Sequence, residues 1–420
     1  MPVEADPVSP KDGAGQAEGR IRLAYLDGIR AIAAIYVAVH HMWLGAWQEY
    51  PANAGPWWVG WLAYGHLAVA VFIVLSGFSL AIEPVRREGH LVGGARRFFR
   101  RRAWRILPTY WAALALSCLL LLVRDQQILG ADGTVVGEQP VTAKGVVVHA
   151  LLLQDVIGSE TPNGAFWSIA IEWQIYFLFP LLLWWARRFG AAGLAVTVTL
   201  TVVGSQYLSL AIPLFAPLQN LVPQFLALFV FGMVGAEALR RTPSIRASRA
   251  MLSAAAAGAA LFVAWAWSAG SAAVVEHYFW IDLGVGVLSV FLLAGLAHSR
   301  PNRFRSFLQV GFLRWTGRFS YSIYLVHAPI LGVVWHFVVA PLRLPPVAAF
   351  LTILVLGTPG IILGSWLFAR VFEEPFLRHR SLSALRDAFA ARFRGGAVPG
   401  RGRSADVVPL RKDVLAAPED

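Results

Sequence analysis

Two ionisable residues stand at helical spacing in an apolar stretch near the start of the chain. Arg30 and His41 are eleven residues apart, which is about three helical turns, so both side chains lie on one face, roughly 16 Å apart along the axis. His40 points about 100° away from that face. A neutral imidazole can take a proton from a hydroxyl near neutral pH. The pair could therefore do acid–base chemistry, although Arg30 as an anchor at the membrane surface and His41 as a packed core histidine explain the same spacing.

Small and polar residues interrupt three further apolar segments. They are Ser76 with Gly77; Ser168, Glu172 and Tyr176; and Ser320, Tyr324 and His327. A serine–glycine step lets another backbone or a ligand come close. The other two sets recur at helical spacing, so each shares a face. A single glutamate among apolar residues either pairs with a cation or keeps its proton, and we interpret Glu172 as functional. The stripe with Tyr324 fits a binding cavity or a seam of hydrogen bonds between helices equally well.

The segment 96–105 is dense in arginine and interleaved with aromatic residues. We expect it to be a loop that leads into a helix beginning at 104, with Pro108 in the first turn. Arginine forks suit phosphate oxygens, and aromatic rings offer stacking surfaces. An anchor for lipid headgroups fits the segment equally well. Nucleic acid is disfavoured as a partner, because no soluble domain presents an element that could read a groove.

The elements that must position these residues are membrane-spanning helices. Hydrophobic residues make up 57% of the 420 residues and charged residues only 14%, which excludes an ordinary soluble enzyme and a disordered chain. One cysteine and the absence of metal-binding motifs argue against a metal site. Continuous apolar runs of about 20 residues indicate helices rather than barrel strands. We predict an all-α, polytopic membrane bundle of about ten helices, at 23–47, 58–82, 104–123, 164–186, 190–210, 221–239, 251–270, 277–298, 319–340 and 347–371.

The distribution of basic residues predicts the orientation of this bundle. One set of alternate connections holds 19 arginines, and the opposite set holds 3 basic residues in all. The arginine-rich set is therefore cytoplasmic by the positive-inside rule, and both termini are cytoplasmic with it. Residues 1–22 lack an apolar signal-peptide core and are predicted to be a disordered N-terminus. Residues 378–420 are predicted to be a basic cytoplasmic tail, with a short surface helix near 382–393.

Several of these segments, taken in order, resemble the acyltransferase 3 family of membrane proteins. They are Leu26-Asp-Gly-Ile-Arg30 followed by His40-His41; Phe72-Ile-Val-Leu-Ser-Gly-Phe78; Arg102-Ala-Trp-Arg105-Ile-Leu-Pro108; Trp167-Ser-Ile-Ala-Ile-Glu172-Trp; Ser320-Tyr-Ser-Ile-Tyr-Leu-Val-His327; and Phe372-Glu-Glu-Pro375. The resemblance implies that 23–377 is a membrane-embedded acyltransferase domain without a fused extracytoplasmic domain. It also implies transfer of an acyl group from a coenzyme A thioester to a hydroxyl.

The resemblance assigns roles to individual residues. It makes Arg30 and His41 a functional pair, which selects His41 over His40, and it associates Arg102 and Arg105 with the acyl donor. We expect His41 and Glu172 to be catalytic, with His41 as general base or as a transiently acylated nucleophile and Glu172 orienting it or stabilising its charged form. We expect substrate contacts from Arg30, Ser76, Arg102, Arg105, Trp167, Tyr324, His327 and Glu373.

The partners follow from the same resemblance. The donor is expected to be acyl-CoA with an acetyl or another short acyl group, and no metal is expected. The acceptor is expected to be a hydroxyl of a cell-surface carbohydrate, a glycolipid or a secondary metabolite, with the protein in the plasma or inner membrane. The alternative from another class is an exporter of a glycan, a lipid-linked intermediate or a metabolite, because buried charges would serve transport too.

Overall fold

The computed structural model describes residues 23–130, 134–159, 161–240, 244–379 and 381–393. Its fold is all-α, as predicted, and the described residues add one antiparallel pair of short strands. The helices are α2 (Ala24–Ala46), η1 (Gly60–Tyr64), α3 (Gly65–Arg86), α4 (Gly94–Val123), α5 (Ala143–Ala150), α6 (Gln154–Ile157), η2 (Gly164–Phe166), α7 (Trp167–Ala211), η3 (Pro213–Leu221), α8 (Gln224–Glu237), η4 (Ala238–Arg240), α9 (Ile245–Glu276), α10 (Tyr278–His298), α11 (Arg303–Leu308), α12 (Gly311–Gly317), α13 (Ser320–Val334), η5 (Trp335–Val339), η6 (Ala340–Leu342), α14 (Pro346–Phe368), η7 (Ala369–Glu373), α15 (Glu374–Arg378) and α16 (Leu382–Phe393), and the strands are β1 (Gln127–Leu129) and β2 (Val135–Glu138).

The number of membrane spans differs from the ten that the sequence predicts. Among the described residues, eight helical stretches are long and apolar enough to cross a membrane, and the bent pair η3 and α8–η4 makes nine. The difference lies in α7, which together with η2 covers both predicted helices, 164–186 and 190–210; the structure has two helices there, joined by a kink. Gly190, between the two predicted helices, has non-helical backbone (φ 78°, ψ 165°), which glycine adopts without strain. The protein is thus a multi-pass membrane protein with a kink where the sequence predicts a turn.

The arginine-rich segment is helical, which corrects the predicted loop at 96–105. The helix α4 begins at Gly94, so Arg102 and Arg105 are about one turn apart on it and Pro108 lies inside the helix. Arginine has a high helix propensity. The buried ring of Phe98 also packs on Phe179 of α7, with ring centroids 5.1 Å apart. This apolar contact holds the basic turns against the bundle, so the helix continues beyond the apolar run.

The bundle is filled by two clusters of buried apolar side chains. The larger cluster joins α3, α4, α7, α8 and α13, and the smaller one joins the second half of α2 to α13 and α14. Within the larger cluster, α3 and α8 pack backbone to backbone. A Cβ atom on Gly77 would lie 2.0 Å from the carbonyl oxygen of Phe229, and one on Gly232 would lie 2.1 Å from that of Val74. The Ser76-Gly77 step therefore lets the backbone of α8 approach α3 closely.

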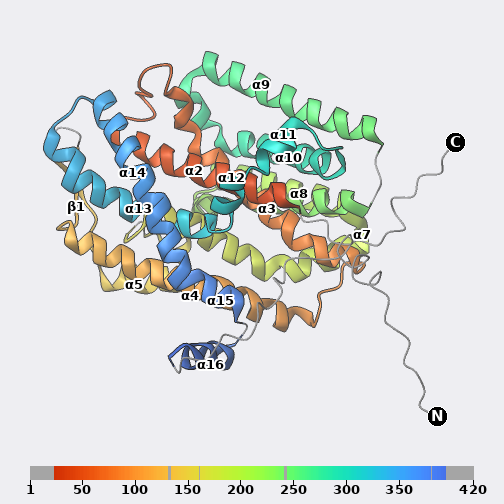
Figure 1. Ribbon diagram of the computed structural model, residues 1–420. Coiled ribbons are helices and arrows are strands. Elements are labelled where there is room, and N and C mark those ends of the chain that lie inside the picture. Colours follow the sequence, from red (N-terminus) through yellow and green to blue (C-terminus); the bar gives the residue numbers. More distant parts are fainter. Residues whose placement is uncertain (1–22, 131–133, 160, 241–243, 380, 394–420) are drawn as a thin grey trace, which may run out of the picture.

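The two ends of the bundle differ in charge because α3, α8 and α10 run side by side in the same direction. They end at or just before Arg86, Arg240 and Arg300 respectively, and we call this end the arginine-rich end. In Figure 1, α9 runs along one outer edge of the bundle, and α16 lies outside it. The helix α16 coincides with the predicted short helix at 382–393. The predicted N-terminus at 1–22, and the predicted tail from 394 onward, lie outside the described residues.

Candidate functional site

His41 on α2 and His327 on α13 meet inside the bundle. Their ring centroids are 4.8 Å apart, with one ring edge against the other face. The Nδ1 atom of His41 lies 2.9 Å from the carbonyl oxygen of Val37, and that of His327 lies 2.7 Å from the carbonyl oxygen of Tyr324. A carbonyl oxygen only accepts hydrogen bonds, so each Nδ1 carries the proton and each Nε2 keeps a lone pair. The Nε2 of His327 is buried and makes no hydrogen bond among the described residues.

His40 has a different environment from His41. Its Nδ1 donates to the carbonyl oxygen of Leu62 at 2.7 Å, and its ring stacks on Trp43 with centroids 5.9 Å apart. The ring also fills the space beside Gly65, where a Cβ would lie 2.2 Å from the His40 Cγ. His40 is thus a packed histidine that holds α2 against the start of α3, whereas the ring of His41 faces the imidazole of another helix.

Tyr324 connects the histidine pair to α7. Its hydroxyl is 2.6 Å from the Ser168 hydroxyl, and its ring centroid is 5.7 Å from that of His327. Asn163, just before η2, donates to the carbonyl oxygen of Leu325 at 3.3 Å. Of the predicted polar stripe on α13, the Tyr324 hydroxyl therefore bonds to the start of α7, whereas the Ser320 hydroxyl donates to the nearby Gly317 carbonyl oxygen.

Glu172 lies in a second cluster, with Ser76, Tyr176 and Arg102. The hydroxyl of Tyr176 donates to the Glu172 carboxylate at 2.5 Å and lies 3.1 Å from the Ser76 hydroxyl. The Arg102 guanidinium stands 6.0 Å from the centroid of the Tyr176 ring. Three predicted site residues from α3, α4 and α7 thus come together around one tyrosine. Glu172 contacts Tyr176 rather than His41, so the hypothesis that it orients His41 stays a prediction.

The remaining predicted substrate contacts, Arg30, Arg105 and Glu373, have partners outside the histidine pair. Arg30 forms an ion pair with Asp27 (3.1 Å) and donates to the Ser79 hydroxyl (2.7 Å). Arg105 is exposed, and its charge interacts with Glu373, whose buried carboxylate accepts a hydrogen bond from Ser322 at 2.5 Å. These charged residues therefore bond to groups other than His41 and His327, and Arg30 stands roughly 16 Å from His41 along α2.

Sequence reasoning missed the surroundings of Trp167. Its ring stacks on His66 with centroids 5.8 Å apart and planes 2° from parallel. His66 in turn contacts Asp282, the single acidic residue of α10. A lone carboxylate in an apolar run is the signal that could have drawn attention to this place. The partner could not be found from spacing, because His66 and Asp282 lie 216 residues apart.

Asp155 on α6 was also missed, and it predicts a pH dependence of stability. One of its carboxylate oxygens is buried without a hydrogen-bond partner among the described residues, and burial raises its pKa from 3.8 to about 7. Between those values the folded state holds one more proton than the unfolded state, so stability falls as pH rises, and the loss is complete above about pH 7. We expect thermal unfolding in detergent to show this fall between about pH 4 and 7. Asp155→Asn should flatten it, whereas the exposed Glu138→Gln should not; equal slopes in all three proteins would contradict this role of Asp155.

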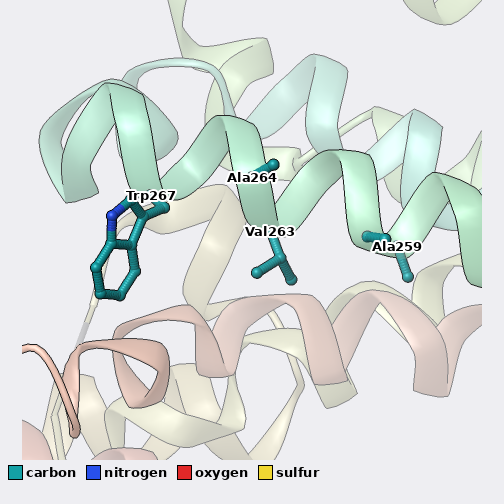
Figure 2. Close-up of a pocket in the computed structure, with 5 residues that line it drawn as sticks. Ala259, Val263, Ala264 and Trp267 are labelled. Carbon is teal, nitrogen blue, oxygen red and sulfur yellow. The ribbon is translucent and has the colours of Figure 1, made fainter.

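Neither a cluster of metal ligands nor the groove on α9 provides a further candidate site among the described residues. Of the described residues, no three histidine, cysteine or acidic side chains gather where they could hold a metal ion. Figure 2 shows an open apolar groove on α9, lined by Ala259, Ala260, Val263, Ala264 and Trp267. Its lining has no group that could act as acid, base or nucleophile.

Comparison with known proteins extends over most of the chain. The family described as an acyltransferase domain matches residues 23–370. The acyltransferase MdmB of Streptomyces mycarofaciens is 28% identical over 343 residues, which cover 74% of this chain and 79% of MdmB. The peptidoglycan O-acetyltransferase OatA of Listeria monocytogenes is 25% identical over 329 residues, which cover 73% of this chain and 49% of OatA.

A shorter match points in the same direction. The putative peptidoglycan O-acetyltransferase YrhL of Bacillus subtilis is 27% identical over 164 residues, which cover 38% of this chain and 23% of YrhL. No solved structure matches the chain significantly. The exporter alternative gains no support from these relatives. Because the family match covers most of the sequence, the predicted resemblance is confirmed, and the chain belongs to the acyltransferase 3 family of membrane O-acyltransferases.

Proposed function

We propose that the protein transfers an acetyl or another short acyl group from acyl-CoA to a hydroxyl of a cell-envelope carbohydrate, a glycolipid or a secondary metabolite, with His41 as general base. The observation that carries this proposal is the His41 ring itself. Its Nδ1–H is held by the Val37 carbonyl oxygen, which leaves the Nε2 lone pair beside His327. A hydrogen bond on one ring nitrogen fixes the tautomer in which the other nitrogen is basic.

The transfer step needs no group beyond these residues and the two substrates. The Nε2 of His41 takes the proton of the acceptor hydroxyl while that oxygen attacks the thioester carbonyl carbon. The new C–O bond forms, the C–S bond breaks, and the imidazolium returns its proton to the leaving CoA sulfur. The unpartnered Nε2 of His327 accepts a hydrogen bond from the acceptor and so holds it in place.

The acyl donor enters from the arginine-rich end in this proposal. Arg102 and Arg105 stand about one turn apart on α4, so their side chains lie on neighbouring parts of one helix face. Arginine forks make charge-assisted hydrogen bonds to phosphate oxygens. The pantetheine arm then passes Arg30 and reaches His41, about 16 Å further along α2. The hydrogen bond from Tyr176 to Glu172 fixes the Tyr176 ring, and the Arg102 guanidinium lies over that ring.

The sidedness and the acceptor class follow from charge and from the relatives. The excess of arginine at one end supports a cytoplasmic donor side and cytoplasmic termini. The histidine pair lies toward the opposite end, where an exported acceptor would arrive. The peptidoglycan O-acetyltransferase among the relatives favours an envelope sugar as the acceptor.

Transfer from labelled acetyl-CoA by the purified protein in detergent tests this proposal. We expect label to leave CoA, by hydrolysis or by transfer to soluble peptidoglycan fragments, and we expect Arg105→Gln to raise the KM for acetyl-CoA by about 10-fold or more, as loss of a hydrogen bond to a charged group predicts. Arg100→Gln removes the same charge from another part of the α4 surface and serves as the matched control. Equal KM values for Arg105→Gln and Arg100→Gln would contradict the phosphate contact, and a protein that leaves acetyl-CoA intact would contradict the function.

A further inference from the structure

A histidine–aspartate pair with a buried carboxylate lies at the start of three helices, outside the pair formed by His41 and His327. The His66 Nε2 on α3 is 2.9 Å from the Asp282 Oδ2 on α10, and the Gln224 side-chain amide on α8 donates to the same oxygen at 3.1 Å. The Asp282 side chain is fully buried, and the His66 side chain is 19% exposed. A carboxylate in an apolar bundle is costly and marks a functional site by default.

Two polar atoms of this group have no hydrogen-bond partner among the described residues. The Oδ1 atom of Asp282 is buried and has no hydrogen-bond partner among the described residues. A buried acceptor without a donor destabilises the protein. Since the Nε2 of His66 donates to Asp282, its Nδ1 keeps a lone pair. A carboxylate that holds one ring nitrogen in this way sets the tautomer and the orientation of the imidazole.

Aromatic rings hold the plane of the His66 imidazole. Trp167 stacks on it at 5.8 Å, and Tyr278 stacks on it at 4.4 Å. The Tyr278 hydroxyl is 2.9 Å from that of Tyr50, in the segment that follows α2. The His66 ring therefore has little freedom to rotate. A binding group needs its geometry to be fixed in this way before the ligand arrives.

The pair lies at the same end of the bundle as His41. Gly65, next to His66 in the chain, packs against the ring of His40, which is next to His41. On the other side, Ser168 follows Trp167 and bonds to Tyr324, whose ring neighbours His327. Two short series of neighbouring residues therefore connect His66 with the histidine pair.

We propose that His66, oriented by Asp282 and Gln224, binds the acceptor: its Nδ1 accepts a hydrogen bond from a second hydroxyl of a polyhydroxylated acceptor, whose reacting hydroxyl lies at His41. This inference rests on the proposed function. His66 touches the acceptor, whereas Asp282 and Gln224 are positioning residues. An acceptor with several hydroxyls, such as a sugar, can reach both places, and an acceptor with a single hydroxyl cannot.

The experiment measures CoA release from acetyl-CoA with and without soluble peptidoglycan glycan fragments. For His66→Gln and Asp282→Asn we expect the KM for the fragments to rise by about 10- to 100-fold, because a hydrogen bond to a charged or charge-oriented group is lost. The KM for acetyl-CoA and the hydrolysis without fragments should stay near the wild-type values. His277→Gln is the matched control, since it makes the same substitution at an exposed histidine just before α10 whose Nδ1 bonds to the Ala273 carbonyl oxygen, and its KM for the fragments should change less than about two-fold.

The outcomes separate this inference from the proposed function. An unchanged KM for the fragments in folded His66→Gln and Asp282→Asn proteins would show that the pair only ties three helices together. Release of CoA by the wild-type protein without acetylation of the fragments would overturn the sugar as the ligand of this pair, but not His41 as base. No CoA release by the wild-type protein would overturn both. If Asp282→Asn fails to fold, His66→Gln alone decides, because it leaves the contact between Asp282 and Gln224 in place.

Discussion

Replacing His41 with alanine is expected to lower kcat for acyl transfer by about 10²- to 10⁴-fold, which is the usual contribution of a general base. The reason lies in the geometry of the ring: Nδ1 is bonded to the Val37 carbonyl oxygen, and Nε2 is the nitrogen left to take a proton. The KM for acetyl-CoA should change little, because in the proposed arrangement its phosphates bind Arg102 and Arg105, beyond Arg30, which itself lies about 16 Å from His41 along α2. Steady-state rates of the purified protein, with CoA release as the readout, measure both quantities.

The neighbouring histidine provides the control for this result. His40→Asn keeps a side-chain N–H near the place from which His40 Nδ1 donates to Leu62, and we expect its kcat to stay within several-fold of wild type. A large loss in folded His40→Asn protein, or retained activity in folded His41→Ala protein, would remove His41 as the catalyst. An acetylated peptide that contains His41, found after brief mixing with acetyl-CoA, would instead assign it the role of nucleophile.

Helical periodicity predicts which residues share a face, but it does not predict the partner across the bundle. Ser168 and Tyr176 lie on the same side of α7, as their spacing requires. The Ser168 hydroxyl nevertheless bonds to Tyr324, whereas the Tyr176 hydroxyl bonds to Glu172. His41 and His327 are separated by 286 residues (327 − 41), and only the packing of α2 against α13 brings their rings together. Spacing contains no information on which helices are neighbours, so such contacts appear only in the fold.

The errors in the predicted elements have a common cause. Counting charges placed the start of the third predicted helix at 104, because arginines interrupt the apolar run. Arginine nevertheless favours helix, and Phe98 anchors that part of α4 to the bundle. By contrast, the break predicted between 186 and 190 corresponds to a kink at which two helices of α7 meet, and the backbone needs only one non-helical residue, Gly190, to change direction there. Hydropathy reports where a helix can sit in a bilayer, and it does not report where the helix ends.

The Gly77→Ala substitution is expected to have the largest effect on stability. Its new Cβ would lie 2.0 Å from the carbonyl oxygen of Phe229, which belongs to the backbone of α8 and cannot rotate away. The two helices must therefore separate, and forced overpacking of this kind lowers the free energy of unfolding by about 1–3 kcal/mol. Thermal unfolding in detergent measures the loss, with Gly204→Ala as the control.

The control and the activity of the same variant distinguish local from distant effects. Gly204 on α7 has no heavy atom within 4 Å of the position that an alanine Cβ would take, so Gly204→Ala should leave the unfolding temperature near that of wild type. Activity should fall in Gly77→Ala beyond what the loss of folded protein explains. The helix α3 carries Ser76, which bonds to Tyr176, and Ser79, which bonds to Arg30, so a shift of this helix disturbs both donor-side contacts at once. Wild-type stability of Gly77→Ala would mean that α3 and α8 do not touch at this glycine, and the placement of Ser76 beside Tyr176 would lose its support.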